Sequence, residues 1–499
     1  MTPVDLTSPG GVAWALIPEI VLTLWALVVL LVLSWRHRTA ADSRLAGWLG
    51  LVGVLTTAAA VGYQAVVGAR PAGLPFMVAL DPFRYAANFL FLASAAATIL
   101  LSLRYVERER LLAPEYYCLI LLATAGMMFM GGAEDLIVLF LGLEVMSVPV
   151  YVLAGYNRAS RFSAEAALKY FLIGAFASAF LLYGIALTYG AMGTTSLPLI
   201  GVQVAGGPIS LMGKLGLALL LVGFAFKVSA VPFHMWAPDV YDGAPTPITG
   251  LMASGVKAAG FVALARVLLE AFPQAATQWQ PIVAFIAIAT MAVGNLVALA
   301  QRSLKRMLAY SSIGHAGYLL VAIWPGTGLA AGAMLFYLVA YLLTTLASFG
   351  LLTAVGSGGE RDVTLDDLAG LGQERPWLAL GLGVCMLSLL GFPGTLGFIG
   401  KWHIFTAAVA EGQVILAVAL ALASAVSAGY YLPVIMAMYM RPAPAGGIQL
   451  PAFSRLAAVT VAVAVVAILL FGVWPRELLD LAQDSVSGLL RPVSAVARW

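Results

Sequence analysis

Five titratable side chains lie deep inside apolar stretches of this sequence, where ionisable groups are rare. They are Glu144, Lys227, Lys257, His315 and Lys401, each flanked by aliphatic and aromatic residues. Carboxyl, amine and imidazole groups can all gain or lose a proton, and burial or a neighbouring charge tunes that exchange. Cation channels typically use rings of acidic side chains, and anion pores use cationic rings. The mixture of Glu, Lys and His matches neither, and it predicts a relay that passes protons.

A single charge in such a stretch has a simpler explanation, which is a long side chain that reaches the membrane surface. Lys169 and Lys214 illustrate it, because both lie close to expected helix ends. Five groups on five helices are harder to explain this way, since each ionisable residue within a membrane span costs at least ~2.5–3.5 kcal/mol. We therefore interpret the five as a functional set.

Composition defines the class of protein to which the chain belongs. It is 62% hydrophobic, only 10% of its 499 residues are charged, and its mean hydropathy is +0.98. Soluble domains average about 25% charged residues. Apolar runs about 20 residues long recur, which predicts an all-α polytopic membrane protein in contact with the lipid bilayer. The formal net charge of +3 is too small to indicate a nucleic-acid partner. Cys118 and Cys385 stand alone in apolar runs, so we expect neither a disulfide nor a metal site.

The apolar runs predict about fourteen transmembrane helices, with ends uncertain by a few residues. The expected ranges are 12–35, 45–67, 81–103, 114–131, 135–156, 164–189, 210–231, 247–271, 279–300, 306–324, 328–355, 376–410, 412–440 and 455–474.

Arginine and lysine gather in alternate loops, which predicts the orientation in the membrane. These residues are Arg36, Arg38, Arg44, Arg104, Arg108, Arg110, Arg158, Arg161, Arg302, Lys305, Arg306, Arg361, Arg375 and Arg441. Their loops all fall on one face if the helix number is even and both termini lie on the other. In a bacterial inner membrane the termini would then be periplasmic.

The seventh and twelfth expected helices each combine a lysine with a helix-breaking proline. The seventh reads GFAFKVSAVPFHMW, with Lys227 before Pro232, and the twelfth reads GFPGTLGFIGKWHIF, with Lys401 after Pro393. Broken helices at membrane depth are tolerated inside protein or beside water, and transporters use them at their mid-membrane sites. We therefore expect both helices to be interrupted near their lysines.

The two breaks lie five helices apart. Helices four to eight and nine to thirteen then form units of opposite orientation, because five is odd, and such units make an inverted repeat. In this arrangement Glu144 corresponds roughly to His315. We predict a three-helix segment over 1–112, the two repeats over 113–272 and 273–441, and a C-terminal helix and tail over 442–499.

Most of the chain resembles a known family. The strongest likeness is in KVSAVPFHMWAPDVYDGAPTPITGLMASGVKAAGFVAL, which is similar to the antiporter-like core of proton-pumping NADH–quinone oxidoreductase, respiratory complex I, and in particular to subunit N. Further matching stretches are DPFRYAANFLFL, GLEVMSVPVYVLAGY, EAALKYFLIGAFASAFLLYGIALTYG, QRSLKRMLAYSSIGHAGYLL and GFPGTLGFIGKWHIF. The related subunits L and M, and cation/proton antiporter subunits, tend to carry PFHTWLPDA and a histidine in helix eight. This chain instead has PFHMWAPDVYDG and Lys257.

The resemblance implies a role for four of the five buried groups. Glu144 and Lys227 match the ion pair of a first half-channel, Lys257 matches a central relay, and Lys401 matches a residue of a second half-channel. The stretch after the first break, APDVYDGAPTP, is interpreted as a cytoplasmic turn rich in proline and aspartate.

The resemblance also implies secondary relay positions at His234 and Lys305, and it places the redox chemistry in other chains. NADH, FMN, iron–sulfur clusters and quinone are expected in partner subunits. This chain should bind no cofactor, since it has no cysteine cluster and no Rossmann or P-loop glycine pattern. The implied partners are the antiporter-like subunit M and small subunits of the K, J and A types, in an enzyme that translocates protons.

Two functions of other classes stay open. One is a subunit of an Mrp-type cation/proton antiporter, which would need a defined cation site, whereas Glu144 is the one strong carboxylate at mid-span. The other is a structural scaffold, which would not need buried lysines. A relative that uses a different electron donor is a third alternative.

Overall fold

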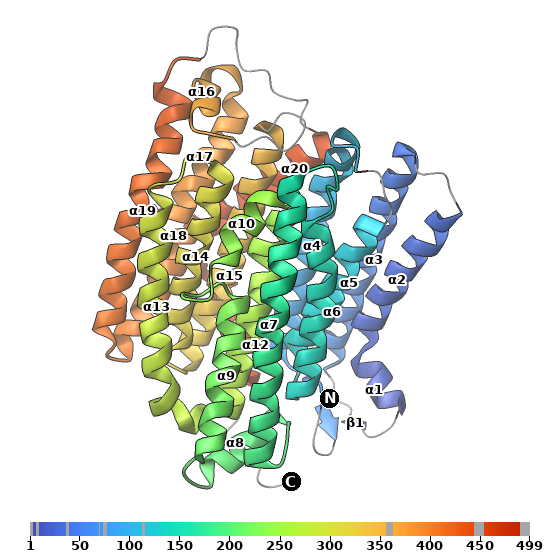
Figure 1. Ribbon diagram of the computed structural model, residues 1–499, viewed down its shortest axis with the longest axis vertical. Helices are drawn as coiled ribbons and strands as arrows, with labels where there is room; N and C mark the ends of the chain where they lie inside the picture. The colour runs from blue at the N-terminus through green and yellow to red at the C-terminus, as the bar shows by residue number, and fades with distance from the viewer. Residues whose placement is uncertain are drawn as a thin grey trace.

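The structure is a computed structural model in which helices stand side by side along one axis (Figure 1). It describes residues 3–5, 9–35, 39–68, 70–72, 77–111, 115–355, 363–443 and 454–489. Within these ranges the regular structure is helical apart from one short pair of parallel strands, which confirms the predicted all-helical class.

Ten helices among the described residues are long and apolar enough to cross a membrane. They are α3 (Ala40–Val67), α4 (Pro82–Arg108), α5 (Glu115–Gly132), α6 (Leu136–Ala154), α7 (Arg161–Met192), the continuous helix Thr246–Ala271, Pro273–Ala298, α15 (Gly328–Val355), α19 (Val414–Met440) and α20 (Arg455–Val473). Three shorter apolar helices are α2 (Ile17–Ser34), α17 (Pro376–Leu390) and α18 (Leu396–Ala410). The protein is therefore polytopic, while the count of about fourteen spans stays a prediction.

The remaining elements are shorter or more polar. They are α1 (Pro9–Ala15), α8 (Leu197–Ala205), α9 (Leu211–Lys227), α10 (Trp236–Gly243), α14 (Leu304–Ile323), α16 (Leu371–Glu374), α21 (Arg476–Ser485), the 3₁₀ turns η3 (Pro273–Ala275), η4 (Asp366–Leu368) and η5 (Val486–Gly488), and the strands β1 (Pro3–Asp5) and β2 (Arg70–Ala72). Within Pro273–Ala298, the α-helix proper is α13 (Ala276–Ala298). Helices α8, α10 and α21 were not expected from the sequence.

The centre of the bundle is the helix Thr246–Ala271, which is buried at every position except Glu270. It consists of α11 (Thr246–Leu251), the π-helical turn η1 (Met252–Val256), α12 (Lys257–Arg266) and the π-helical turn η2 (Val267–Ala271). π-Helical turns are rare and are frequent at functional sites. Lys257 is the first residue after one of them, so the most enclosed helix carries both a charge and an irregular backbone.

Local sequence explains where several helices begin. Asp81 caps α4 by accepting a hydrogen bond from the Arg84 backbone amide at 2.8 Å, and Pro82 occupies the first turn. Asp135 caps α6 in the same way, through the amide of Ile137 at 2.7 Å. Both caps position residues of an ion-pair cluster described below.

The two expected helix breaks are present, and the broken helices run in opposite directions. Helix α9 rises from α8 at the lower end of Figure 1 and stops at Lys227, and α10 resumes at Trp236 above it. Helix α17 starts near α16 at the upper end and stops at Leu390, and α18 resumes at Leu396 below it. Gly391 and Gly394 have φ angles of 87° and 86°, in the left-handed region that favours glycine.

The stretch APDVYDGAPTP is not the predicted turn, because its first half forms the helix α10. Trp236 and Tyr241 are buried and anchor this helix against its neighbours. Pro238 lies in the first turn of α10, where a missing backbone amide removes no intrahelical hydrogen bond. Proline and aspartate are typical of turns, but here the burial of the aromatic side chains of Trp236 and Tyr241 stabilises a helix.

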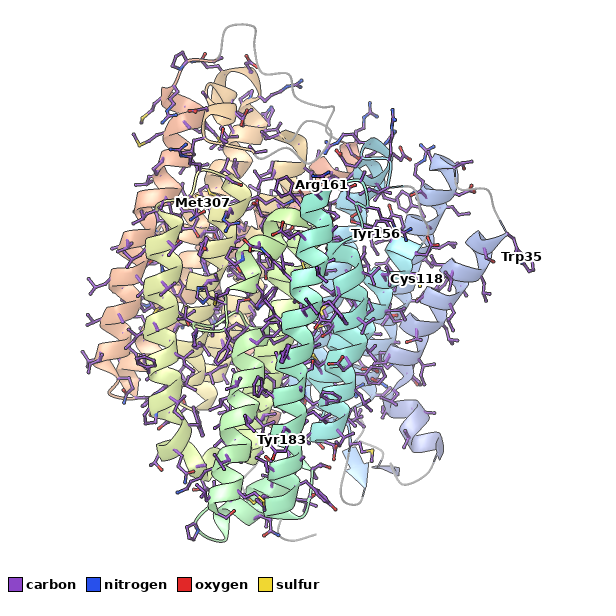
Figure 2. The ribbon with its side chains drawn as sticks, viewed as in Figure 1. Trp35, Cys118, Tyr156, Arg161, Tyr183 and Met307 are labelled. Carbon is purple, nitrogen blue, oxygen red and sulfur yellow. The ribbon has the colours of Figure 1, made fainter. Side chains whose placement is uncertain are left out.

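The arginine-rich connections meet at the upper end of the bundle. Figure 2 shows Arg161 and Met307 toward this end and Tyr183 toward the other. Arg44 pairs with Glu107 at 3.0 Å, and Arg108 donates to the Thr353 carbonyl at 2.7 Å, which joins the ends of three long helices there. Arg36, Arg38 and Arg361 lie outside the described residues.

The elements near the two chain ends lie at the lower end. Strand β1 and helix α1 are seen there in Figure 1. Gln483 of α21 lies beside Gly332 near the start of α15. Helix α14 runs from Met307, toward the upper end, to the lower end, and α15 follows it in the chain. The basic connections and the terminal elements therefore occupy opposite ends.

Candidate functional site

Four of the predicted site residues are buried cations or imidazoles inside the bundle. Lys227, Lys257, His315 and Lys401 are between 1% and 5% exposed, on α9, α12, α14 and α18 respectively. Glu144 on α6 is half-buried, and its neighbours on the outer face of the bundle are exposed apolar side chains. The five residues thus come from five helices, and four of them lie where water is scarce.

Glu144 and Lys227 do not form the direct ion pair that the resemblance implied. The Ser178 hydroxyl donates to Glu144 Oε1 at 2.5 Å, while Lys227 Nζ donates to the Ser147 hydroxyl at 2.9 Å. Ser147 follows Glu144 by three residues on α6, so both side chains share one helix face. The Lys227 ammonium therefore bonds to a hydroxyl one turn away from Glu144 on α6, and not to the carboxylate.

Lys257 is held by a single residue of the neighbouring helix α14. Its ammonium donates to the Ser312 carbonyl at 2.8 Å and also to the Ser312 hydroxyl. The centroid of the Tyr241 ring lies 5.9 Å from the ammonium. The polar partners of Lys257 among the described residues are a carbonyl and a hydroxyl and not a carboxylate, so the site suits a group that takes up and releases a proton.

His315 lies between two tyrosine hydroxyls. Its Nδ1 is 2.6 Å from the Tyr337 hydroxyl and its Nε2 is 3.1 Å from the Tyr431 hydroxyl. The Tyr431 hydroxyl also hydrogen-bonds to Ser311. The rings of Tyr318 and Tyr341 pack against the imidazole, with centroids 5.3 and 5.0 Å away. Both ring nitrogens therefore have hydroxyl partners in a dry pocket of aromatic side chains.

Lys401 is bound to the end of the preceding half-helix. Its ammonium donates to the carbonyls of Leu389 and Leu390 at 2.8 and 2.9 Å, and to the Ser424 hydroxyl at 2.9 Å. It also lies 4.7 Å from the centroid of the Tyr318 ring, a cation–π distance. All three ammonium protons have acceptors, so Lys401 both stabilises the break and carries a charge beside the His315 pocket.

His234 and Lys305, the two secondary positions, lie at the edges of this arrangement. His234 is half-buried in the segment between α9 and α10. Lys305 is 8% exposed and donates to the Ala244 carbonyl at 2.6 Å, where α10 ends. Both residues thus flank α10 rather than the central helix.

Lys169, which we read as a side chain reaching the membrane surface, instead belongs to a half-exposed ion-pair network. Its ammonium is 2.6 Å from both Glu165 and Asp239, and Asp239 also pairs with Arg306 at 2.9 Å. This network ties α10 to α7 and α14. We refer to Lys169, Asp239 and Arg306 as the α10 clamp.

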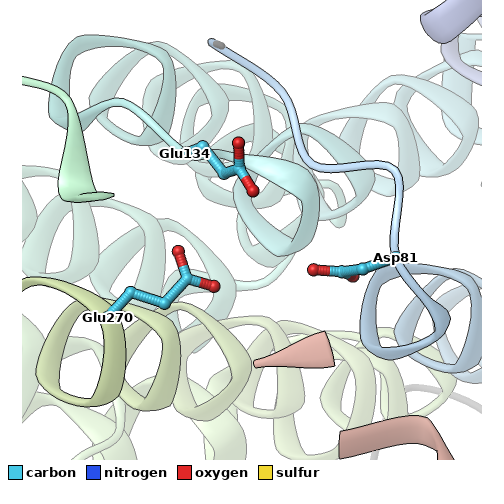
Figure 3. Close-up of side chains that lie close together, drawn as sticks. All are labelled: Asp81, Glu134 and Glu270. Carbon is cyan, nitrogen blue, oxygen red and sulfur yellow. The ribbon is translucent and has the colours of Figure 1, made fainter. Parts of the chain in front are cut away.

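A second charged cluster lies at the lower end and was not found from the sequence (Figure 3). Carboxylate oxygens of Asp81, Glu134 and Glu270 lie within 4.8 Å of one another. The Arg266 guanidinium pairs with Asp81 at 2.9 Å and with Glu270 at 2.7 Å. Because this guanidinium lies among the carboxylates, the cluster is an ion-pair network that joins α4, the end of α5 and the central helix.

Sequence reasoning missed the hydroxyl partners of the site. They are Ser147, Ser178, Ser311, Ser312, Ser424, Tyr337 and Tyr431. A weak signal existed, since Ser147 follows Glu144 by three residues and Ser312 precedes His315 by three. Serine three positions from a buried charge shares its helix face. The tyrosines lack such a signal, because they reach His315 from other helices.

The chain is similar to known proteins in both sequence and structure. Residues 133–427 match the family described as NADH:quinone oxidoreductase/Mrp antiporter, TM. NADH-quinone oxidoreductase subunit N of Gemmatimonas aurantiaca is 46% identical over 97% of this chain and 95% of that protein. A chain of respiratory complex I from Thermus thermophilus is 36% identical, with a TM-score of 0.78 over 93% of this chain and 99% of that one. A chain of the Mrp complex from Dietzia is 22% identical with a TM-score of 0.82 over 96% of this chain and 99% of that one, a likeness of fold.

Proposed function

This chain belongs to the subunit N family of NADH–quinone oxidoreductase, and we propose that it moves protons through its buried Glu, Lys and His residues while partner subunits transfer electrons. The observation that carries this proposal is the set of buried lysines whose partners are mostly hydroxyls and carbonyls. Ionisable groups inside a membrane protein are costly and mark ion or proton pathways by default. A lysine paired with a carboxylate would hold its proton, whereas one paired with a neutral hydroxyl releases it more readily.

Each buried group has a role in the proposed path. Glu144 and Lys227 form the first half, with the Lys227 ammonium bonded to Ser147, one turn from Glu144 on α6. Lys257, at the π-helical turn in the enclosed central helix, passes the proton onward. His315 and Lys401 form the second half. His234 and Lys305, on either side of α10, serve the entrance from the upper end.

The opposite directions of the two broken helices support an inverted repeat over 113–272 and 273–441. The basic connections at the upper end support a cytoplasmic location for that end, because lysine and arginine are enriched in cytoplasmic loops. Both termini would then be periplasmic in a bacterial inner membrane. The redox cofactors would reside in partner subunits, and the neighbours would include subunit M and the small K, J and A subunits.

Lys257 provides the test of this function. Lys257→Ala should leave the complex assembled but greatly reduce NADH-driven proton uptake by membrane vesicles, because the central relay is lost. Lys257→Arg should fail as well, since arginine is effectively never deprotonated. Lys214→Ala is the matched control, because Lys214 is an exposed lysine near the start of α9 and should pump like the wild type.

Native gel electrophoresis completes the experiment by reporting assembly. The chain should migrate with flavin-containing and iron–sulfur-containing subunits in the wild type and in all three variants. Normal proton uptake by Lys257→Ala at equal complex content would refute the relay. Migration as a small assembly without redox subunits would instead favour an Mrp-type antiporter subunit.

A further inference from the structure

We propose that Ser311, Tyr431, His315 and Tyr337 form a hydrogen-bonded row that carries protons between the Lys257 and Lys401 regions, with the two tyrosine hydroxyls as required members. We refer to these four residues as the tyrosine–histidine row. The inference rests on the proposed function and assigns groups that the family comparison does not name.

The row is continuous in the structure and spans three helices. Ser311 and His315 lie one turn apart on α14, and the Tyr431 hydroxyl from α19 hydrogen-bonds to both, at 3.1 Å from His315 Nε2. The Tyr337 hydroxyl from α15 lies 2.6 Å from His315 Nδ1. The three ring-bearing side chains are at most 2% exposed. Such a row has no bulk water that could replace a missing hydroxyl.

The ends of the row lie beside the two lysine sites. Ser311 is adjacent in the chain to Ser312, which accepts the hydrogen bonds of Lys257. The Tyr337 ring packs against Gly400, the residue before Lys401, where a Cβ on the glycine would lie 2.5 Å from the ring. Gly400 therefore allows Tyr337 to approach the helix that carries Lys401.

The chemistry of the row matches proton transfer without a charged intermediate on tyrosine. A neutral imidazole has one donor nitrogen and one acceptor nitrogen, and a hydroxyl can donate and accept at once. A proton that enters at the Ser311 end binds Ser311 Oγ, and the proton already on this hydroxyl passes to the Tyr431 hydroxyl oxygen. Tyr431 passes its own proton to Nε2, Nδ1 releases its proton to Tyr337, and the Tyr337 proton leaves at the far end.

Each member of the row gains one proton and gives up another, so the protons balance. The imidazole changes tautomer, and the hydroxyls must rotate before the next transfer. Both ring nitrogens of His315 face tyrosine hydroxyls and not carboxylates. This arrangement favours a histidine that relays a proton through its tautomers over one that stores it.

The adjacent residue Tyr430 offers a matched control. Tyr430 and Tyr431 are both buried in α19, but the Tyr430 hydroxyl donates to Asn295 Oδ1 at 2.8 Å, whereas the Tyr431 hydroxyl bonds to Ser311 and His315. Tyr→Phe removes one hydroxyl at either position and keeps the ring. The experiment compares Tyr431→Phe with Tyr430→Phe in membrane vesicles at equal complex content, and measures proton uptake driven by NADH oxidation in H₂O and in D₂O.

The expected result is a severalfold loss of proton uptake in Tyr431→Phe and near-normal uptake in Tyr430→Phe. The residual uptake of Tyr431→Phe should show a larger solvent isotope effect than the wild type, because proton transfer has become limiting. Near-normal uptake in both variants would overturn the row. Equal loss in both would also overturn it, because packing and not the Tyr431 hydroxyl would then be responsible.

Tyr337→Phe tests the other end if Tyr431→Phe does not assemble. It removes the hydroxyl at Nδ1 and should cause a comparable loss, and normal uptake would overturn the proposal. Lys257→Ala, measured in parallel, distinguishes failure of the tyrosine–histidine row from failure of the proposed function. If Lys257→Ala abolishes uptake while both row variants pump normally, the row fails and the proposed function stands. If Lys257→Ala pumps normally, the proposed function itself fails.

Discussion

The two broken helices of this protein solve the same problem with different groups. A helix that stops inside the bundle leaves backbone carbonyls without intrahelical partners. At the end of α9, the Phe226 carbonyl accepts from the Ser229 amide at 3.0 Å and from Trp236 Nε1 at 3.1 Å. At the end of α17, the Leu389 carbonyl would be paired with the amide of residue 393, which is Pro393 and has none. Lys401 Nζ donates to that carbonyl instead.

The difference leaves the two lysines with unequal freedom. Lys227 is the last residue of α9 but takes no part in capping, and its one hydrogen bond is to Ser147. Lys401 uses all three ammonium protons, two of them on the freed carbonyls. A lysine with one neutral acceptor can give up its proton with little rearrangement, whereas Lys401 must leave a structural position to do so. Proton release at the first break therefore needs less rearrangement of hydrogen bonds than proton release at the second.

The largest effect is expected from Lys401→Met. The Leu389 carbonyl loses its ammonium donor, and a buried acceptor without a partner costs about 1–3 kcal/mol. We expect a lower melting temperature of the purified complex together with loss of proton uptake. Lys401→Arg is the informative companion, because it restores donors but cannot release a proton. Lys401→Arg should therefore keep more of the stability than Lys401→Met but still pump poorly, and normal pumping by the arginine variant would contradict proton exchange at Lys401.

A smaller structural effect and a large functional one are expected from Lys227→Met. Only the Ser147 hydroxyl loses a donor, and it keeps its own bond to the Leu143 carbonyl at 2.5 Å. The variant should melt close to the wild type and pump poorly. Glu144→Gln and Lys227→Met should be non-additive in proton uptake when combined, because the Lys227 ammonium is bound one turn from Glu144 on α6 and the two residues would serve one step. Additive losses would mean that the two residues act independently.

Trp236→Phe tests the cap of the first break. It removes one of the two donors to the Phe226 carbonyl but keeps an aromatic ring to stack on Tyr170 at a centroid distance of 4.4 Å. A hydrogen bond of this kind contributes about 0.5–1.5 kcal/mol. We expect a modest fall in melting temperature, less than for Lys401→Met. A larger fall than that of Lys401→Met would reverse the ranking of the two caps.

The smallest effect is expected from Asp239→Asn in the α10 clamp. The carboxylate is about one-third exposed, and exposed ion pairs typically contribute about 0.2–1 kcal/mol. The variant should assemble and pump near normally at low ionic strength, with the difference from wild type shrinking further as salt is added. A strong loss of pumping with unchanged stability would instead assign the clamp a role in proton entry through α10.

Much of this protein could be predicted from short stretches of its sequence. Apolar length and the rarity of charge predicted the membrane class, because each span must bury its backbone polar groups by itself. Proline and glycine near Lys227 and Lys401 predicted the two interruptions, because their backbone constraints are local. The buried lysines could also be recognised locally, because the residues next to them in the sequence are mostly apolar and would not stabilise a charge.

Only the tertiary structure decided what those charges contact. Glu144 and Lys227 were expected to pair directly, and in the structure the Lys227 ammonium bonds to Ser147 while Glu144 bonds to Ser178. Tyr431 and Lys401 reach their partners from segments distant in the chain or across a break. A hydrogen bond needs its donor and acceptor within about 3 Å, and apolar patterning sets which face of a helix is buried but not which hydroxyl arrives there. The sequence by itself determined that protonatable groups lie inside a membrane bundle, and the packing of the helices determined their order and partners.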